Sequence, residues 1–216
     1  MILFGASISP FVRKVLMCAN EKGLTLEHRP VSPHVDDPEF KACSPLGKIP
    51  AFQDGDYTLA DSSAIVHYLD AKYPANPVIP ADARARGKAI WFEEYCDTVL
   101  FPTASMIFIN RVLFPKFRKT PGDTAKADDL ATNHVPPLFA YLESVVPAQG
   151  FIAGDSFTIA DAAVTCQLVN LQHSDVTVDA GKYPKLAAYF SRMVARASVA
   201  ELVAAEQKLI KMMETN

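Results

Sequence analysis

The strongest restriction on the fold of this chain is a proline-rich break at residues 74–80. The segment reads Pro-Ala-Asn-Pro-Val-Ile-Pro, and prolines spaced this closely exclude a helix and do not fit a strand pattern. Strand and helix patterns alternate before the break, whereas only helical stretches follow it. The sequence therefore predicts two domains, at residues 1–75 and 82–216, joined by a linker at residues 74–81.

The first domain begins with a strand–helix–strand pattern. Residues 1–5 are a short apolar run that fits a buried strand. Residues 9–23 fit a helix, because a serine suits the N-cap, a proline suits the first helical position and a glycine suits the end. Residues 25–31 alternate in polarity like an edge strand. Such a unit implies a parallel pair of strands.

The rest of the first domain is predicted to be a hairpin and a helix. Apolar runs at residues 49–53 and 57–59 flank an Asp-Gly turn, which is typical of a β-hairpin. Asp61 or Ser62 then caps a helix that ends near Tyr73. The loop before the hairpin holds at most one short helix. The resulting order, β-α-β-loop-β-β-α, describes a compact α/β domain.

The second domain is predicted to be an all-α helical bundle. Pro102 and the pair Pro136-Pro137 are expected to kink or interrupt the first two of its helical stretches. Thr158 and Asp161 have the spacing of a helix capping box. The predicted helical stretches are residues 81–114, 122–146, 158–172, 184–195 and 198–214.

Composition and charge exclude several classes of function. The net charge of −3 provides no basic surface for nucleic acid. No stretch approaches the roughly 18 apolar residues of a membrane span, and no secretory signal is evident, so we expect a cytoplasmic protein without a membrane partner. The histidines form no metal-like cluster. The cysteines, which have no metal-ligand spacing either and are expected to be reduced, are Cys18, Cys43, Cys96 and Cys166.

Four motifs carry a family resemblance. Residues 9–15, Ser-Pro-Phe-Val-Arg-Lys-Val, resemble the first helix of serine-type glutathione transferases. Residues 48–52 resemble the cis-proline segment of that family, residues 61–65 its γ-glutamyl clamp, and residues 157–162 the capping signature of its helical domain. With the four motifs in this order and spacing, the chain resembles the cytosolic glutathione S-transferases of the serine type, and is similar to bacterial members and to the theta, phi and tau types.

The resemblance implies a fold, a reaction and an assembly. The fold is a thioredoxin-like N-terminal domain (βαβ-ββα) followed by an all-helical domain that carries the electrophile site. The expected co-substrate is glutathione, with no metal, and the partner substrate is a small hydrophobic electrophile. Peroxide reduction with glutathione is a further expected activity, and detoxification the expected role. A homodimer is also implied.

Ser9 is the residue expected to activate the glutathione thiol. A free thiol titrates near 8.5, and lowering that to about 6.5 takes about 2.7 kcal/mol of preferential thiolate stabilisation. A charge-assisted hydrogen bond contributes roughly 1.5–3 kcal/mol, and the N-terminus of a helix adds about 0.3–1 kcal/mol, so no general base is needed. Ser7 is a competing hydroxyl, and a plain N-cap is the alternative role for Ser9.

Five further residues are expected to hold glutathione. The resemblance implies that Pro50 is cis, which would turn the backbone of Ile49 toward the cysteinyl backbone of glutathione. Lys48 could reach the glycyl carboxylate, although a solvated lysine is the alternative. Ser62 and the helix start suit the γ-glutamyl carboxylate, and Asp61 suits its ammonium group. Asp61 is one methylene shorter than the glutamate usual in the family.

The electrophile site is expected to include Phe11, Phe108 and Arg111, for each of which core packing is the alternative. No cysteine lies at the start of the first helix, which argues against mixed-disulfide chemistry through a protein thiol. Two other functions stay open. One is a non-catalytic binding or regulatory relative, and the other is a specialised glutathione-dependent isomerase, dehalogenase or disulfide reductase.

Overall fold

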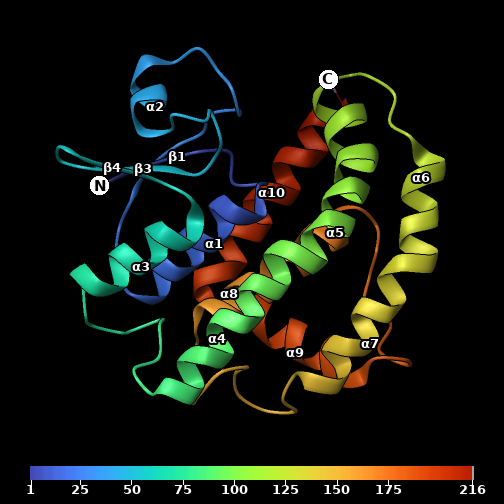
Figure 1. Ribbon diagram of the computed structural model, residues 1–216. Helices are drawn as coiled ribbons and strands as arrows, with labels where there is room; N and C mark the ends of the chain where they lie inside the picture. Colours follow the sequence, from blue (N-terminus) through green and yellow to red (C-terminus); the bar gives the residue numbers. More distant parts are fainter. Residues whose placement is uncertain (216) are drawn as a thin grey trace.

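The computed structural model describes residues 1–215 (Figure 1). The α/β part of the chain contains β1 (Ile2–Phe4), α1 (Pro10–Glu21), β2 (Glu27–Arg29), α2 (Pro38–Cys43), β3 (Ala51–Asp54), β4 (Tyr57–Ala60) and α3 (Ser62–Lys72). The helical part contains α4 (Ala83–Tyr95), η1 (Cys96–Leu100), α5 (Phe101–Phe108), η2 (Ile109–Phe117), α6 (Thr124–Asp129), η3 (Leu130–His134), α7 (Val135–Val145), α8 (Ile159–His173), α9 (Pro184–Val194) and α10 (Ala197–Thr215), where η marks a π-helical segment.

The strands form one mixed sheet in the order β2-β1-β3-β4. β1 pairs in parallel with β2 and antiparallel with β3, and β3 pairs antiparallel with β4. Helices α1 and α3 cover one face of the sheet and α2 lies beyond the other (Figure 1). This is the thioredoxin-like arrangement that was predicted. Pro30 and Pro50 fall just outside the strands, because a proline nitrogen cannot donate to a ladder hydrogen bond.

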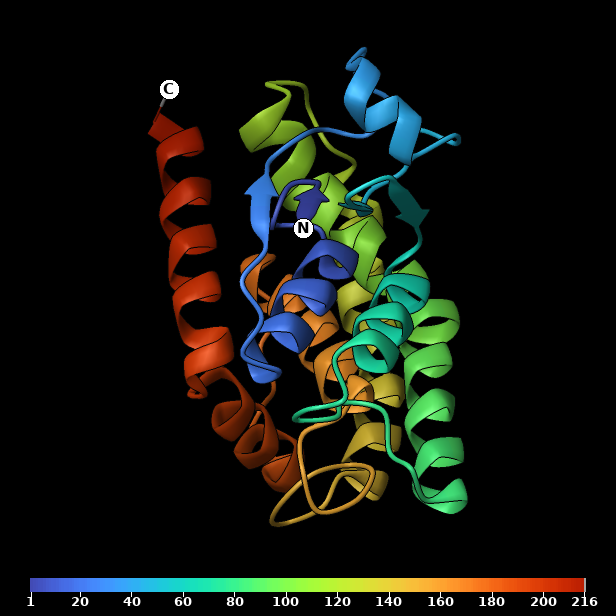
Figure 2. The ribbon, with the colours of Figure 1, turned by 90° about the vertical axis from the view of Figure 1, so that its left-hand side faces the viewer.

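The helical bundle is built around α8. Almost every residue of α8 is buried, as is the middle of α1, whereas α4 is buried along one side only. α1 and α4 both pack against α8, so the central helix also contacts the α/β part. Figure 2 shows α10 as a long helix running beside α1 along one side of the molecule. Within residues 1–215 no strand follows β4, in agreement with the predicted all-helical domain.

The prolines widen the long helices without ending them. Pro102 is the second residue of α5, and the π-helical segment η1 lies directly before it. Pro136 stands in the same relation to η3, and η2 contains Pro115. A proline has no N–H and its ring clashes with the carbonyl group four residues earlier, and a π-turn relieves both problems by shifting the bonding register. The expected interruptions therefore take the form of π-turns inside continuous helices.

One helical stretch, Ala83–Phe117, is long and apolar enough to cross a membrane by length and composition alone. No stretch of this kind was expected from the sequence. The core helix of a globular fold passes the same test, and the stretch includes fully buried side chains that pack into the bundle core. These are Ala89, Cys96, Leu100, Ala104 and Ile107.

A buried ion cluster joins α1 to the C-terminal helix. The Arg13 guanidinium donates to Glu206 through Nε (2.9 Å) and Nη2 (2.7 Å), and neither side chain is exposed. Arg13 Nη1 also donates to Asn170 Oδ1 (2.8 Å) and to the Cys166 carbonyl (2.9 Å) of α8. The His173 ring lies 2.9 Å from the Glu206 carboxylate. Burial alone would raise the pKa of Glu206, but Arg13 and the hydrogen bond to His173 outweigh burial and lower the pKa.

The start of α8 is held by a second buried carboxylate. Asp161 and Thr158 form the predicted capping box. The Asp161 carboxylate accepts from the Thr158 backbone N–H (2.9 Å), from the Ile152 backbone N–H (3.0 Å) and from the Tyr189 hydroxyl (2.7 Å). The sequence signal identified the box itself. The two additional donors tie α8 to the preceding loop and to α9.

Replacing Glu206 with glutamine should destabilise the protein in a pH-dependent way. At neutral pH the Arg13 charge would be left buried without a counter-charge, which costs roughly 3–5 kcal/mol. The pKa of Glu206 is lowered on folding, so the ion pair stabilises above the unfolded value of about 4.3 and loses that effect as the pH falls through the folded value. Urea unfolding should therefore show a difference between wild type and Glu206→Gln that shrinks below about pH 4. A constant difference would contradict this view.

Substitutions in the capping box should separate its local part from its long-range part. Thr158→Ala removes one cap and should cost about 1 kcal/mol. Asp161→Ala leaves the buried donors of Ile152 and Tyr189 without an acceptor, so a loss of about 3 kcal/mol or more in the free energy of unfolding is expected. Urea denaturation followed by circular dichroism measures both values, and equal losses would show that the extra donors contribute nothing.

Candidate functional site

The register of the sheet brings three chain turns to one edge. Phe4 pairs with Ala51 across β1 and β3, and Ala51 pairs with Ala60 across β3 and β4. The residue after β1, the residue before β3 and the residue after β4 therefore lie beyond the same end of the sheet. After β1 the chain continues toward Ser9 and α1. Residues 48–50 lead into β3, and β4 is followed directly by α3.

Gly5 allows these turns to approach one another closely. Its φ of 138° is in the region that favours glycine. A Cβ atom at this position would lie 2.5 Å from Val12 Cγ2 and 3.0 Å from Ile49 Cβ. Any side chain here would push α1 away from the segment that contains Ile49.

Ser9 occupies the N-cap position of α1 with a half-buried side chain. Its backbone N–H donates to the Ala6 carbonyl (3.0 Å) and its carbonyl accepts from the Arg13 N–H (3.0 Å). Its hydroxyl makes no capping hydrogen bond to the helix as the structure describes it. The hydroxyl thus stands at the positive end of a 12-residue helix without being used to cap it. Ser7 lies in the turn just before, also half-buried.

The Ile49–Pro50 peptide bond is cis, as the resemblance implied. Ile49 is half-buried, Pro50 is buried, and Lys48 is exposed. The Ser44 hydroxyl donates to the Lys48 carbonyl (2.7 Å), which anchors the segment from the other side. The backbone of Ile49 is therefore held at the sheet edge next to Gly5.

Asp61 has an unusual backbone conformation at the start of α3. Its φ is 84° and its ψ is 128°, a strained combination for a residue with a side chain, and such strain clusters at functional sites. One carboxylate oxygen accepts from the N–H groups of Ser63 (2.9 Å) and Ala64 (3.1 Å). No hydrogen bond of the other oxygen occurs in the described structure at this exposed position. Ser62 is buried beside it.

The residues expected at the electrophile site are not all brought together. Phe11 is half-buried and lies 4.6 Å from Phe101, centroid to centroid. Phe108 packs in a small cluster with Ile8, next to Ser9 in the chain, and with Ile210 of α10. Phe11 therefore lies on α1 itself, and Phe108 packs against the turn that precedes α1.

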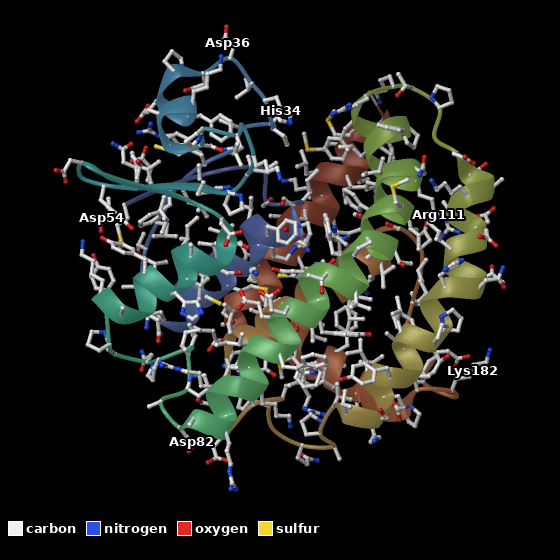
Figure 3. All side chains as sticks on the ribbon, in the orientation of Figure 1. His34, Asp36, Asp54, Asp82, Arg111 and Lys182 are labelled. Atoms are coloured by element: carbon white, nitrogen blue, oxygen red, sulfur yellow. The ribbon has the colours of Figure 1, made fainter. Side chains whose placement is uncertain are left out.

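Arg111 points elsewhere. Its guanidinium donates to the Ser174 carbonyl (2.8 Å) and to the Asp128 carboxylate (2.7 Å). Figure 3 shows it on the side of the helix that faces α6. The π-helical segment η2 starts at Ile109, and a wider turn no longer keeps residues three apart on one face. This contact set gives no support to the prediction that Arg111 lines the site with Phe108.

His34 is a candidate that the sequence analysis passed over by treating all five histidines alike. It is exposed, has a φ of 61°, and its N–H donates to the Gly47 carbonyl (2.8 Å). It therefore stands beside the residue that precedes Lys48, on the loop between the sheet and α2 (Figure 3). Only the fold brings these two loops together, so local sequence gave no signal for it.

Two surface depressions lie away from this edge of the sheet. One, of about 230 Å³, is lined by α8 and α9 residues such as Gln172 and Phe190. The other, of about 490 Å³, lies between the linker and the start of α8, near Pro80 and Ser156. Neither includes a residue expected to bind glutathione or the electrophile.

Comparison with known proteins matches both halves of the chain to one family. Residues 3–77 match the glutathione S-transferase N-terminal domain and residues 109–206 match the glutathione S-transferase C-terminal domain. Glutathione S-transferase 3 of Zea mays is 34% identical over 165 residues, which cover 74% of this chain and 73% of that protein. A glutathione S-transferase of Triticum aestivum is 42% identical over 86 residues, covering 40% of each chain.

A solved structure agrees with the sequence matches. A glutathione transferase homologue from Drosophila mojavensis, with bound glutathione, superposes with a TM-score of 0.80 at 27% identity and covers 99% of this chain and 96% of its own. Sequence, domain order and fold agree, and the chain therefore belongs to the glutathione S-transferase family of enzymes.

Proposed function

We propose that this enzyme binds glutathione at the edge of its sheet, stabilises the thiolate with the Ser9 hydroxyl, and directs it at a small hydrophobic electrophile. The observation that carries the proposal is the Ser9 hydroxyl at the N-terminus of α1, which makes no capping hydrogen bond within the described residues. A hydroxyl that caps its own helix is engaged there, whereas this one is available to a ligand. The same thiolate would also serve peroxide reduction.

The position of Ser9 meets the energetic requirement for thiol activation. Moving the thiol pKa from about 8.5 to about 6.5 takes about 2.7 kcal/mol. The hydroxyl can supply roughly 1.5–3 kcal/mol as a charge-assisted hydrogen bond, and the end of α1 about 0.3–1 kcal/mol. The cysteines of the chain are buried, so the sulfur that reacts in this proposal is that of glutathione.

The remaining glutathione contacts follow the three turns. The backbone of Ile49, next to Gly5 at this edge, pairs with the cysteinyl unit. Lys48 takes the glycyl carboxylate, and the imidazole of His34 is a second donor on the same side. Ser62 and the N-terminus of α3 hold the γ-glutamyl carboxylate.

Asp61 is assigned to the γ-glutamyl ammonium group. One of its oxygens caps α3, and the other stays available for this contact. The electrophile site is proposed to lie beside Phe11 and Phe108. Arg111 is not included, because Asp128 and Ser174 already occupy its guanidinium.

We further propose the predicted domain division, residues 1–75 and 82–216 with a linker at 74–81, and a cytoplasmic location. A homodimer is proposed as well, with the α/β domain of one subunit against the helical domain of the other. Exposed apolar side chains on both domains support it: Tyr57 is 44% exposed on β4, and Trp91 is 58% exposed on α4.

The dimer can be tested through Trp91. Light scattering in solution should give twice the mass of one chain, and Trp91→Glu should shift the protein toward the monomer, because a charge at a buried apolar contact is costly. A monomeric wild type would contradict the proposal.

Ser9→Ala tests the proposed chemistry directly. Removing the hydroxyl should lower kcat/KM for conjugation of a small aromatic electrophile by roughly one hundredfold, the equivalent of about 2.7 kcal/mol. Glutathione should still bind, because the backbone and α3 contacts are untouched. The bound thiol should titrate nearer 8.5, as followed by thiolate absorbance against pH.

Ser7→Ala is the matched control, since it removes a hydroxyl from the preceding turn. It should leave both the rate and the thiol titration close to wild type. If Ser9→Ala conjugates normally, Ser9 is not the activator, and a loss seen only in Ser7→Ala would transfer the role to Ser7. A wild type that does not bind glutathione would favour a non-catalytic role for the fold.

A further inference from the structure

Lys14 places an ammonium group in the interior, where the two domains meet. It lies five residues after Ser9 in α1, and its side chain is 1% exposed. Its Nζ donates to Glu93 Oε1 (2.9 Å), Asp97 Oδ2 (2.9 Å) and Ser63 Oγ (3.2 Å). An ammonium group has three hydrogens to donate, so each has one acceptor, on α4, η1 and α3 respectively.

The contact with Ser63 leads toward the proposed glutathione site. Ser63 is the second residue of α3, and its backbone N–H donates to the Asp61 carboxylate (2.9 Å). Ser63 therefore connects the buried ammonium of Lys14 to the residue whose φ of 84° marks the strained start of α3. A strained turn persists only where its surroundings fix it, and Lys14 supplies one of those restraints from α1.

The charge on Lys14 is held in place by its surroundings. Burial alone would lower the pKa of Lys14, but the carboxylates of Glu93 and Asp97 outweigh burial and raise the pKa above its ordinary value. The Phe11 ring lies over the ammonium, with its centroid 5.7 Å from Nζ. The ammonium group is therefore available as the donor to Ser63, and Lys14 itself is too buried to touch a ligand.

We propose that Lys14 is a positioning residue of the glutathione site. Its ammonium holds Ser63, and through Ser63 the Asp61 turn, in a fixed relation to the N-terminus of α1 that carries Ser9. This inference rests on the function proposed above. It predicts that loosening the contact weakens glutathione binding and leaves the thiol chemistry intact.

Ser63→Ala is the most selective test. It removes the hydroxyl that accepts from Lys14. The Ser63 backbone N–H still donates to Asp61, and Lys14 keeps its ion pairs with Glu93 and Asp97. The dissociation constant for glutathione, measured by calorimetry, should rise roughly three- to tenfold, and KM for glutathione should rise with it. The kcat at saturating glutathione and the pH at which the bound thiol ionises should not change.

Lys14→Gln and Lys22→Gln form a matched pair of variants. Lys22 is 5% exposed and donates to Asp70 (2.7 Å), which ties the far ends of the same two helices, α1 and α3. Both variants should lower thermal stability. Only Lys14→Gln should raise the dissociation constant for glutathione, by at least as much as Ser63→Ala. If Lys14→Gln does not fold, because two carboxylates lose their cation, Ser63→Ala decides alone.

Two results would overturn this inference while the proposed function stands. One is wild-type glutathione affinity in Ser63→Ala, and the other is an equal loss of affinity in Lys22→Gln and Lys14→Gln. A parallel fall in kcat with an altered thiol ionisation in Ser63→Ala would also count against a positioning role. An unaltered protein that binds no glutathione would instead overturn the proposed function and this inference with it.

Discussion

The ion pair between Arg13 and Glu206 is the contact on which the arrangement of the two domains depends. Both side chains are fully buried, and the residues are 193 positions apart in the chain. A buried pair of this kind contributes little net stability when compared with well-packed apolar residues, but breaking it leaves a charge in the interior. The pair therefore acts through specificity: α10 can pack on α1 in few ways other than the one that joins these two charges.

Helix α1 is the element that this constraint positions, and it has an unusual interior face. Arg13 and Lys14 point into the protein, toward α8 and α10 and toward α3 and α4 respectively. Each cation requires acceptors from another part of the chain, so the orientation of α1 about its own axis is fixed by charge as well as by apolar packing. The start of the same helix presents Ser9 at the edge of the sheet.

Features that depend on residues close together in the chain could be predicted from the sequence, whereas contacts between distant residues could not. Strands, the hairpin and the Thr158 capping box depend on neighbours within a few residues, and all three were found. Lys14 reads as a surface charge on an ordinary helix, because its acceptors lie 49 to 83 positions away. The partners of Arg111 are distant in the same way, since Asp128 and Ser174 lie 17 and 63 positions away.

The two halves of the proposed site differ in predictability because only one of them is built from local turns. The glutathione half consists of backbone turns that the strand register and the close approach at Gly5 bring together, and the motifs at these turns carry the family resemblance. The electrophile half is made of apolar side chains on long helices, where a wall of a site and a core contact use the same residue types. Phe108 illustrates the difficulty, since it packs with Ile8 before α1 and with Ile210 of α10, and such distant partners carry no local signal in the sequence.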